Sequence, residues 1–304
     1  MSKLLILDTF YFLHRSFHGY PKDLKNSKEE YTGMTFGLAK AIFEIIKEVE
    51  PTHFICAWES EELPSFRKTL YPDYQKTRMQ MEPDDEMVFS SQFPNIIKLL
   101  EVFNIPRITS NGFEGDDVLG TMATLASSEM DEVVISTSDQ DLMQLIDDKI
   151  TIFRPGKPPF IPKAYFTPET FKEKYGFEPV KMIDYKALRG DPSDNIPGVK
   201  GIGEKTATSL IQEFGDLDGI YANLDNVKEV VRKKLIEDKD RAYLSKQLAT
   251  IITNIPIEFT FDKAELFDFN FDAVEKFFDK MEFKSLAKPL AELKERSFNN
   301  LPLF

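Results

Sequence analysis

Three short apolar runs, each suited to one buried strand, are spaced along the first half of the chain. They cover Lys3–Leu7, His53–Trp58 and Glu132–Thr137. Between the first two runs, Gly33–Glu50 carries apolar residues at helical spacing, and Pro51 ends that pattern. Strands that alternate with helices predict an α/β domain with a largely parallel central sheet.

The pattern changes after a proline-rich connector, Arg154–Pro162, where we expect the first domain to end. Beyond it, Met182–Leu188 and Gly198–Gly215 show helical spacing, which predicts a small helical domain. Phe271–Phe283 has the spacing of one more helix, which most simply packs back on the body of the protein. We therefore expect an α/β domain over residues 1–163, a helical domain over 164–262, and a C-terminal helix and tail over 263–304.

Composition limits the classes of protein to which the chain can belong. Its 304 residues, 42% of them hydrophobic, suffice for one large globular domain or two ordinary ones. The one cysteine, Cys56, excludes a disulfide framework and favours a reducing compartment. The run Leu4–Leu7 is cut off by Asp8 and is too short for a signal peptide or a membrane span. We expect a cytoplasmic protein that does not bind membranes.

Carboxylates stand where each predicted strand ends, and three more open a helical pattern. The carboxyl ends of parallel strands meet at one edge of the sheet, where ligands bind. Any one of these acids could simply cap the helix that follows it. Seven at one edge would repel one another without cations, and only three histidines and one cysteine are present, so oxygen ligands for Mg²⁺ or Mn²⁺ are favoured over a zinc site. The seven are Asp8, Glu59, Glu114, Asp116, Asp117, Asp139 and Asp141.

The net charge of −13 at first argues against a nucleic acid as partner. Acids that surround divalent cations, however, leave basic surface elsewhere to meet a polyanion. Residues 59–94 mix basic and aromatic side chains, which suits a phosphate backbone and unstacked bases. The alternative is an ordinary solvated excursion, but its place next to the acidic edge favours substrate contact. The side chains concerned are Arg67, Lys68, Lys76 and Arg78, with Phe66, Tyr71 and Tyr74.

A second nucleic-acid signal lies in Gly198–Gly215, where Gly201-Ile202-Gly203 makes a tight turn into an amphipathic helix. Glycines let the backbone approach a phosphate closely, and amides of the first helical turn donate to it. We interpret the stretch as a helix-hairpin-helix that binds the DNA backbone without regard to sequence, with hairpin carbonyls able to hold K⁺. The residues expected to contact DNA here are Lys200, Gly201, Gly203, Lys205 and Thr206.

Three stretches carry a resemblance to a known family. They are EGDDVLG at Glu114–Gly120, TSDQDLMQL at Thr137–Leu145 and GDPSDNIPGVKGIGEKTA at Gly190–Ala207. The chain resembles the 5′-nuclease family, which includes the 5′–3′ exonuclease domain of bacterial DNA polymerase I and the flap endonucleases, from about Leu4 to residue 260. With no polymerase region following, it looks like a stand-alone member. The resemblance implies a PIN-like domain with a helical arch, followed by the helix-hairpin-helix domain.

The resemblance also implies roles for individual residues. It adds Asp191 and Asp194 to the seven carboxylates as ligands of two or more Mg²⁺ or Mn²⁺ ions. It matches Arg15, Arg67 and Arg78 to the family's basic residues and puts Phe17 where an aromatic can stack on a terminal base. We expect Arg67, Lys76 and Arg78 to clamp the scissile phosphate, and Arg15 and Phe17 to contact DNA. One ion would rest mainly on Asp8, Glu114 and Asp116 and activate water, whereas another would rest on Asp117, Asp139, Asp141 and Asp194 and stabilise the leaving oxygen.

Three positions depart from the family's pattern. Glu59 stands where an aspartate is usual, Gln75 where the arch commonly has a lysine, and Gly115 where an alanine is usual. Because all nine acidic positions keep an acid, we expect an active enzyme.

The function implied is a structure-specific 5′–3′ exonuclease or flap endonuclease that hydrolyses DNA near flaps, nicks or 5′ ends in replication and repair. Two alternatives remain at this point. One is a metal-dependent ribonuclease or phosphatase on a PIN-like sheet, which needs neither hairpin nor arch. The other is a non-catalytic binder of branched DNA, for which Glu59 and Gln75 are the only support.

The last residues, Asn299–Phe304, read NNLPLF. This tail is similar to the short motif with which bacterial replication proteins bind the sliding clamp, with Asn300 in place of glutamine. We therefore consider the sliding clamp as a partner of Asn300–Phe304. The simpler alternative is a tail that packs on its own core.

Overall fold

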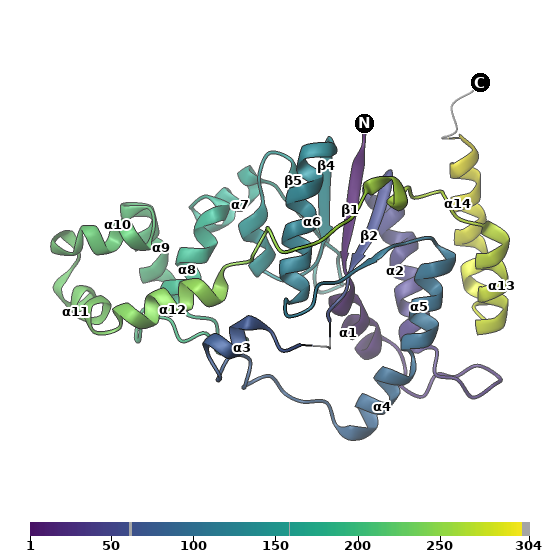
Figure 1. The fold of residues 1–304 in the computed structure, drawn as a ribbon, viewed down its shortest axis with the longest axis horizontal. Coiled ribbons are helices and arrows are strands. Elements are labelled where there is room, and N and C mark those ends of the chain that lie inside the picture. Colours follow the sequence, from purple (N-terminus) through teal and green to yellow (C-terminus); the bar gives the residue numbers. More distant parts are fainter. Residues whose placement is uncertain (61–62, 158, 300–304) are drawn as a thin grey trace.

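The computed structural model describes residues 1–60, 63–157 and 159–299, and a six-stranded sheet forms the centre of this part of the chain (Figure 1). The strand order is β3-β2-β1-β4-β5-β6, and every neighbouring pair is parallel except β5 with β6. The strands are β1 (Lys3–Asp8), β2 (His53–Ala57), β3 (Arg107–Ile108), β4 (Glu132–Ser136), β5 (Ile150–Arg154) and β6 (Ala164–Phe166).

The register of the sheet brings three strand ends to one edge. Ala57, the last residue of β2, lies beside Asp8, the last residue of β1. On the other side of β1, the last residue of β4, Ser136, lies beside Leu7. Residues that follow β2 and β4 therefore emerge next to Asp8, as expected for parallel strands.

Helices cover the sheet on both faces, and the small second domain is helical throughout (Figure 1). The α-helices of the first part are α1 (Thr9–Gly19), α2 (Gly33–Val49), α3 (Phe66–Leu70), α4 (Pro83–Ser91), α5 (Phe93–Val102) and α6 (Gly115–Glu129). Those that follow are α7 (Pro168–Tyr175), α8 (Met182–Arg189), α9 (Glu204–Phe214), α10 (Leu217–Ala222), α11 (Glu229–Glu237), α12 (Lys239–Ala249), α13 (Phe271–Met281) and α14 (Ala287–Asn299). Short 3-10 turns are η1 (Asp141–Leu145), η2 (Pro179–Lys181), η3 (Leu224–Asn226), η4 (Phe261–Ala264) and η5 (Lys284–Leu286).

Alternate residues of β1 belong to two different apolar cores. Leu5 and Leu7 pack in the core that includes α1, α2 and α5, whereas Leu4 and Ile6 pack in the core that includes α6. Because side chains of a strand alternate between faces, a strand with helices on both sides must be apolar at every position. This is why KLLIL reads as a continuous apolar run.

The first domain extends beyond the predicted boundary at residue 163. β6, at residues 164–166, pairs with β5 and forms the edge of the sheet, so it belongs to the first domain. The helical domain has no separate core, since apolar residues of α8 and α9 join the cluster that contains β1, β4 and α6. The two parts therefore hold the sheet edge and the hairpin in a fixed relation.

The C-terminal residues return to the first domain, as the sequence predicts. α13 and α14 pack near α2 and α5, at the end of the molecule opposite α10 and α11 (Figure 1). Phe277 and Phe278 are buried in the same core as Phe43 and Phe103. The predicted single helix is thus followed by a second one, and residues 300–304 of the tail lie outside the described residues.

The prediction of a largely parallel α/β domain followed by a helical domain is confirmed. Among the helices in the described ranges, none has both the length and the hydrophobicity to cross a bilayer. The free cysteine, Cys56, is buried in β2.

We predict that Gly37 sets the close approach of α1 and α2. A Cβ at this position would lie 2.6 Å from both Cβ and Oγ of Ser16, which cannot move away without moving the backbone of α1. Gly37→Ala should therefore lower the free energy of unfolding by about 1–3 kcal/mol through overpacking, measured by urea denaturation. Gly19→Ala is the control, because its Cβ would meet nothing within 4 Å. Equal stability of the two variants would contradict this account.

Candidate active site

A cleft of about 420 Å³ opens at the carboxyl edge of the sheet. The acids reach it from several elements: Asp8 ends β1, Asp139 follows β4, and the pair Glu114 and Asp116 stands at the start of α6. Glu59 follows β2 and completes the set. Five of the nine predicted carboxylates therefore line one cleft, with Phe10, Tyr11, His14, Gln75, Arg78, Gly115 and Ser138 as the other lining residues.

The electrostatics of the cleft show carboxylates that lack a positive partner. Burial raises the pKa of Asp8 to about 6; hydrogen bonds from the Thr137 hydroxyl at 2.6 Å and from the Tyr11 amide at 3.2 Å oppose the shift, and the charge of Asp139 adds to it. Burial also raises the pKa of Asp116 well above its usual range, and the charges of Asp139, Asp8 and Glu114 raise it further. Within the described residues, Asp8 and Asp116 form no ion pair with lysine or arginine. Such a group favours the binding of a cation.

The donor set fits a divalent metal ion, although no site is closed around one point. The Oε1 atom of Glu114 is buried and has no hydrogen-bond partner, which leaves a ligand oxygen available. The donors are all carboxylate oxygens, the preferred ligands of Mg²⁺ and Mn²⁺. In residues 1–60, 63–157 and 159–299, no three Asp, Glu, His or Cys side chains converge closely enough to hold a metal ion as they stand. The predicted convergence is therefore seen as a shared cleft rather than a finished coordination shell.

Asp117, predicted as a metal ligand, forms a buried ion pair in this structure. Its side chain is 0% exposed and faces Arg67, which donates from Nη1 to Oδ2 at 2.7 Å and from Nη2 to Oδ1 at 2.8 Å. The Ile252 amide also donates to Oδ1, at 2.9 Å. Both oxygens thus accept hydrogen bonds in this structure, and metal binding by Asp117 stays a prediction.

Arg67 is also held by protein groups in this structure, and its contact with a phosphate stays a prediction. Its side chain is 3% exposed, and besides Asp117 it donates to the carbonyl oxygens of Leu248 at 2.9 Å and Thr250 at 2.7 Å. A bidentate guanidinium–carboxylate contact of this kind is a strong buried pair. Nη1 of Arg67 also lies 3.7 Å from Oε2 of Glu114. Arg67 therefore joins α3, α6 and the end of α12.

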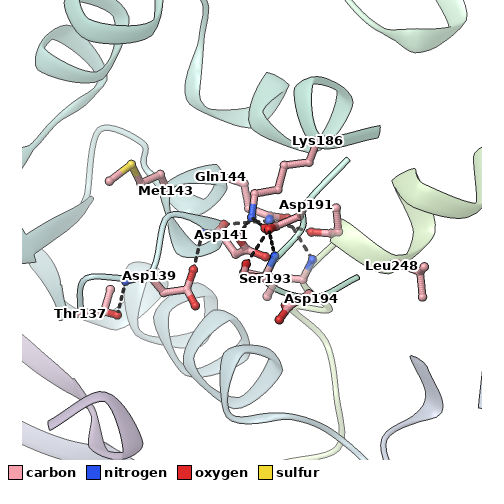
Figure 2. Close-up of polar contacts among 12 residues, drawn as sticks. Thr137, Asp139, Asp141, Met143, Gln144, Lys186, Asp191, Ser193, Asp194 and Leu248 are labelled. Carbon is pink, nitrogen blue, oxygen red and sulfur yellow. Dashed lines mark hydrogen bonds and ion pairs between the residues drawn. The ribbon is translucent and has the colours of Figure 1, made fainter. Parts of the chain in front are cut away.

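Asp141 and Asp194, predicted for a second metal position, and Asp191, predicted as a further metal ligand, pair with protein cations; Figure 2 shows the group around Lys186. The Lys186 ammonium pairs with both Asp141 and Asp191, lying 2.6 Å from Oδ2 of Asp191. Arg78 pairs with Asp194, where Nη2 to Oδ1 is 2.6 Å. Asp139 lies close to these three carboxylates (Figure 2). The three already pair with the ammonium of Lys186 or the guanidinium of Arg78.

The two remaining predicted phosphate ligands have different positions. Arg78 lines the cleft and is half-exposed, so one face of its guanidinium is accessible. Lys76 is 73% exposed, pairs with Asp73 at 2.9 Å, and is not among the lining residues. Gln75 does line the cleft, and its backbone N–H donates to the backbone carbonyl of Asp194 at 2.9 Å. The position that departs from the family's pattern is therefore at the site, and Lys76 is beside it.

Tyr74 is a site residue that sequence reasoning recorded only as an aromatic. Its hydroxyl lies 3.0 Å from Oε2 of Glu114 and 3.4 Å from Oδ2 of Asp194. It thus connects residues 63–91, the arch segment that contains α3 and α4, to acids of both domains. In Figure 1 this segment spans the carboxyl edge of the sheet, from α3 near the helical domain to α4 below α5.

The predicted contacts of α1 with DNA are not supported for Phe17. This side chain is 3% exposed and packs edge-on against Phe89 with 5.3 Å between ring centroids, so it cannot stack on a terminal base. Arg15 donates to the Gly156 carbonyl at 2.6 Å and lines a separate groove between α1, α2 and residues 155–163. The apolar spacing of a helix does not reveal which aromatic residue is core, and here Phe17 is.

The hairpin has the geometry that its glycines predict. Gly201 has φ +77°, a conformation that L side chains rarely adopt, and Gly203 caps the start of α9. Lys200 and Lys205 are exposed at this end. Lys234, from α11, donates its ammonium to the Gly201 carbonyl at 2.9 Å. The carbonyl oxygen expected to help bind K⁺ therefore already has a cationic partner, which the sequence did not reveal because Lys234 is 33 residues away.

An acidic cleft at the carboxyl edge of a parallel sheet, with a helix-hairpin-helix beside it, defines a class of proteins built to hold nucleic-acid phosphates. Two family models match the chain: a 5′–3′ exonuclease N-terminal, resolvase-like domain over residues 3–176, and a 5′–3′ exonuclease C-terminal SAM fold over residues 177–272. The chain belongs to the 5′–3′ exonuclease family. The models meet thirteen residues beyond our predicted boundary at 163, on the far side of β6 and α7.

Curated relatives support this assignment over almost the whole chain. DNA polymerase I of Bacillus subtilis is 36% identical over 292 residues, which are 96% of this chain and 32% of the relative. The thermostable DNA polymerase I of Thermus thermophilus is 37% identical over 286 residues, 94% of this chain and 32% of the relative. The chain thus spans about a third of the length of these relatives.

Solved structures share the fold. The 5′-exonuclease of T5, with divalent metal ions (zinc) bound, superposes with a TM-score of 0.66 at 23% identity, covering 92% of this chain and 98% of that one. The catalytic core of Rad2 in complex with a DNA substrate gives a TM-score of 0.63 at 18% identity, covering 96% and 92%. Both similarities extend over the sheet and the helical domain together.

We predict that the Arg67–Asp117 pair is a major stabilising contact. Arg67→Met would leave Asp117 buried without a counter-charge and should cost about 3–5 kcal/mol of unfolding free energy, measured by urea denaturation. The control is Arg232→Met, which removes an ion pair 3.6 Å long to the exposed Asp225 and should cost under about 1 kcal/mol. If both variants lost equally little, the Arg67–Asp117 pair would not be a major stabilising contact.

Two departures from the family's pattern are predicted to compensate each other. A Cβ on Gly115 would lie 3.3 Å from Cγ of Glu59, so the longer acid occupies space that the usual alanine would need. In the Glu59→Asp background, Gly115→Ala should stabilise the protein by up to about 1 kcal/mol, because alanine is the better helix former. In the wild-type background crowding should cancel or reverse this gain. Additive effects in the double-mutant cycle of unfolding free energies would contradict the compensation.

Proposed function

We propose that this protein hydrolyses phosphodiester bonds near the 5′ ends of branched or nicked DNA, as a 5′–3′ exonuclease or flap endonuclease. The observation that carries the proposal is the cleft at the carboxyl edge, where Asp8 and Asp116 have raised pKa values and Glu114 keeps a buried oxygen without a partner. Its position beside a helix-hairpin-helix, in a chain of the 5′–3′ exonuclease family, favours DNA as substrate.

The cofactor we propose is Mg²⁺ or Mn²⁺, in two positions. Asp8, Glu114 and Asp116, with Glu59 and Asp139 nearby, would hold the first ion. Asp139, Asp141, Asp191 and Asp194 would provide the second position. Bound there, divalent ions supply Lewis-acid activation of water and neutralise charge on the phosphate.

Protein groups around the cleft orient the substrate. Arg78, half-exposed at the cleft wall, can donate to a phosphate oxygen and stabilise negative charge that grows in the transition state. Tyr74 holds the arch segment against Glu114 and so fixes the position of Arg78 and Gln75. A single-stranded 5′ end would pass beneath the arch segment, which lies over the acids.

The duplex behind the 5′ end would rest on the hairpin. Gly201 would let the backbone come close to a phosphate, and the first-turn amides of α9, which have no partner within the helix, would donate to it. Lys200, Lys205 and the ammonium of Lys234 add positive charge at this end. These contacts reach only the backbone, so binding should not depend on DNA sequence.

Three narrower points are also proposals. The K⁺ ion that the hairpin could hold would share its position with the Lys234 ammonium. The cytoplasm suits a protein whose one cysteine is a buried free thiol. Sliding-clamp binding through Asn300–Phe304 rests on the sequence alone, because those residues lie outside the described part of the chain.

The test is cleavage of a 5′-flap substrate with and without Mg²⁺. Wild-type protein should cut the flap in a Mg²⁺-dependent manner, and Asp116→Asn should lower the rate by about 10²-fold or more, because it removes a ligand oxygen's charge from the cleft. Asp279→Asn, the same change on the exposed face of α13, is the matched control and should cut at the wild-type rate.

Outcomes other than flap cleavage separate the alternatives. Binding of the flap without cleavage in any divalent metal would favour a non-catalytic DNA binder. Equal cleavage of unstructured RNA would favour the ribonuclease. Either result would overturn the proposal.

A further inference from the structure

Lys186 is a buried lysine placed among acids of both domains. It stands in the last turn of α8, and its side chain is 5% exposed. The ammonium pairs with Asp141, from the turn after β4, and with Asp191, which follows α8. Figure 2 shows the side chain reaching from α8 into the group formed by Asp141, Asp191 and Ser193.

The Lys186 ammonium is the cation that the acids of this group share, and hydrogen bonds hold those acids in place. Asp191 accepts from Lys186 on Oδ2 at 2.6 Å, and its Oδ1 accepts from the amide and hydroxyl of Ser193 at 2.9 and 2.5 Å. Burial alone would raise the pKa of Asp191, but Lys186 and Ser193 together lower it to about 2. Removing a charge from water is costly, and a buried lysine stays charged only when such carboxylates surround it.

The two halves of the acidic edge therefore differ in how their charge is balanced. On the Asp8 and Asp116 side, carboxylates face one another, and within the described residues no lysine or arginine pairs with these two. On the Asp141 and Asp191 side, one ammonium already pairs with both acids. A divalent ion gains full attraction on the first side, whereas on the second it meets a positive charge.

We propose that Lys186 is an internal cation that occupies the second metal position, so that a divalent ion binds there only when the Lys186 side chain moves out. This inference rests on the proposed function, since it assumes that the four acids of that position serve metal ions. A lysine is suited to such an exchange because its charge is a point at the end of four rotatable bonds. The first position fills independently of Lys186.

The consequence is unequal binding of two ions. The first ion binds tightly at Asp8, Glu114 and Asp116. The second ion binds weakly, because the Lys186 ammonium must first leave Asp141 and Asp191. Lys186 also keeps the metal-free protein folded by preventing repulsion between the domains at Asp141 and Asp191.

The experiment is a titration of the full chain with Mn²⁺ alone, followed by calorimetry and without DNA. Wild-type protein should show one tight ion and a second that is weak or not detected. Lys186→Met removes the competing charge with a side chain of similar length and should tighten the second ion by at least about tenfold, with the first changed by less than about twofold. Lys186→Arg keeps the charge and should show no tightening.

Lys246→Met is the matched control. Lys246 also pairs with an aspartate of α8, with Nζ 2.7 Å from Oδ1 of Asp184, so its loss alters the same domain by the same chemical change. It should leave both Mn²⁺ affinities as in the wild type. A second affinity that is unchanged or weaker in Lys186→Met would overturn the inference.

A measurement on the wild-type protein covers the case in which Lys186→Met does not fold. Lys186 should resist reductive methylation in the absence of metal, and Mn²⁺ should speed its modification at least about threefold by releasing the ammonium from its buried pair. Lys246 is the internal reference and should be unaffected. A Lys186 rate that stays the same or falls would overturn the inference.

These results separate this inference from the proposed function. Protein that binds no Mn²⁺ at Asp8, Glu114 and Asp116 would refute the metal-dependent function itself. Normal first-ion binding with an unaltered second affinity in Lys186→Met would refute only the role of Lys186.

Discussion

The structure depends on how negative charge is balanced at one edge of a parallel sheet. The topology brings acids from β1, from the residues after β2 and β4, and from the start of α6 to the same place. Left alone, such a group would oppose folding, since neighbouring carboxylates raise one another's pKa values. The protein answers this in two ways, with its own cations in some positions and with a cleft that suits metal ions in others.

The protein's own cations bind the parts of the molecule together. Arg67 compensates Asp117 and at the same time holds the backbone at Leu248 and Thr250, which connects α3 to the end of the helical domain. Lys186 joins Asp141 of the first domain to Asp191 of the second. Because these pairs are buried, they fix the hairpin relative to the cleft.

Asp8 and Asp116, described carboxylates without a protein cation beside them, lie in the cleft that we propose as the active site. Asp8 and Asp116 have raised pKa values, and Glu114 keeps a buried oxygen without a partner. A stable protein would normally avoid this cost, so its presence at a cleft indicates a ligand that offsets it. Glu59 and Gly115, two departures from the family's pattern, are neighbours at the cleft, since a Cβ on Gly115 would lie 3.3 Å from Cγ of Glu59.

The sequence by itself determined the sheet, the edge and the chemistry. Runs such as KLLIL followed by Asp8 predicted buried parallel strands that end in acids, since strand period and connection rules depend on local order. The glycines before α9 likewise predicted the hairpin turn that φ +77° at Gly201 confirms. What only the tertiary structure decided was the partner of each charge. Asp117 and Asp116 are neighbours in the chain, yet one is sealed against Arg67 and the other faces the cleft, because a helix turns successive side chains in different directions. Lys186, Lys234 and Tyr74 could not be assigned in advance, since their contacts join segments whose distance in space no local pattern records.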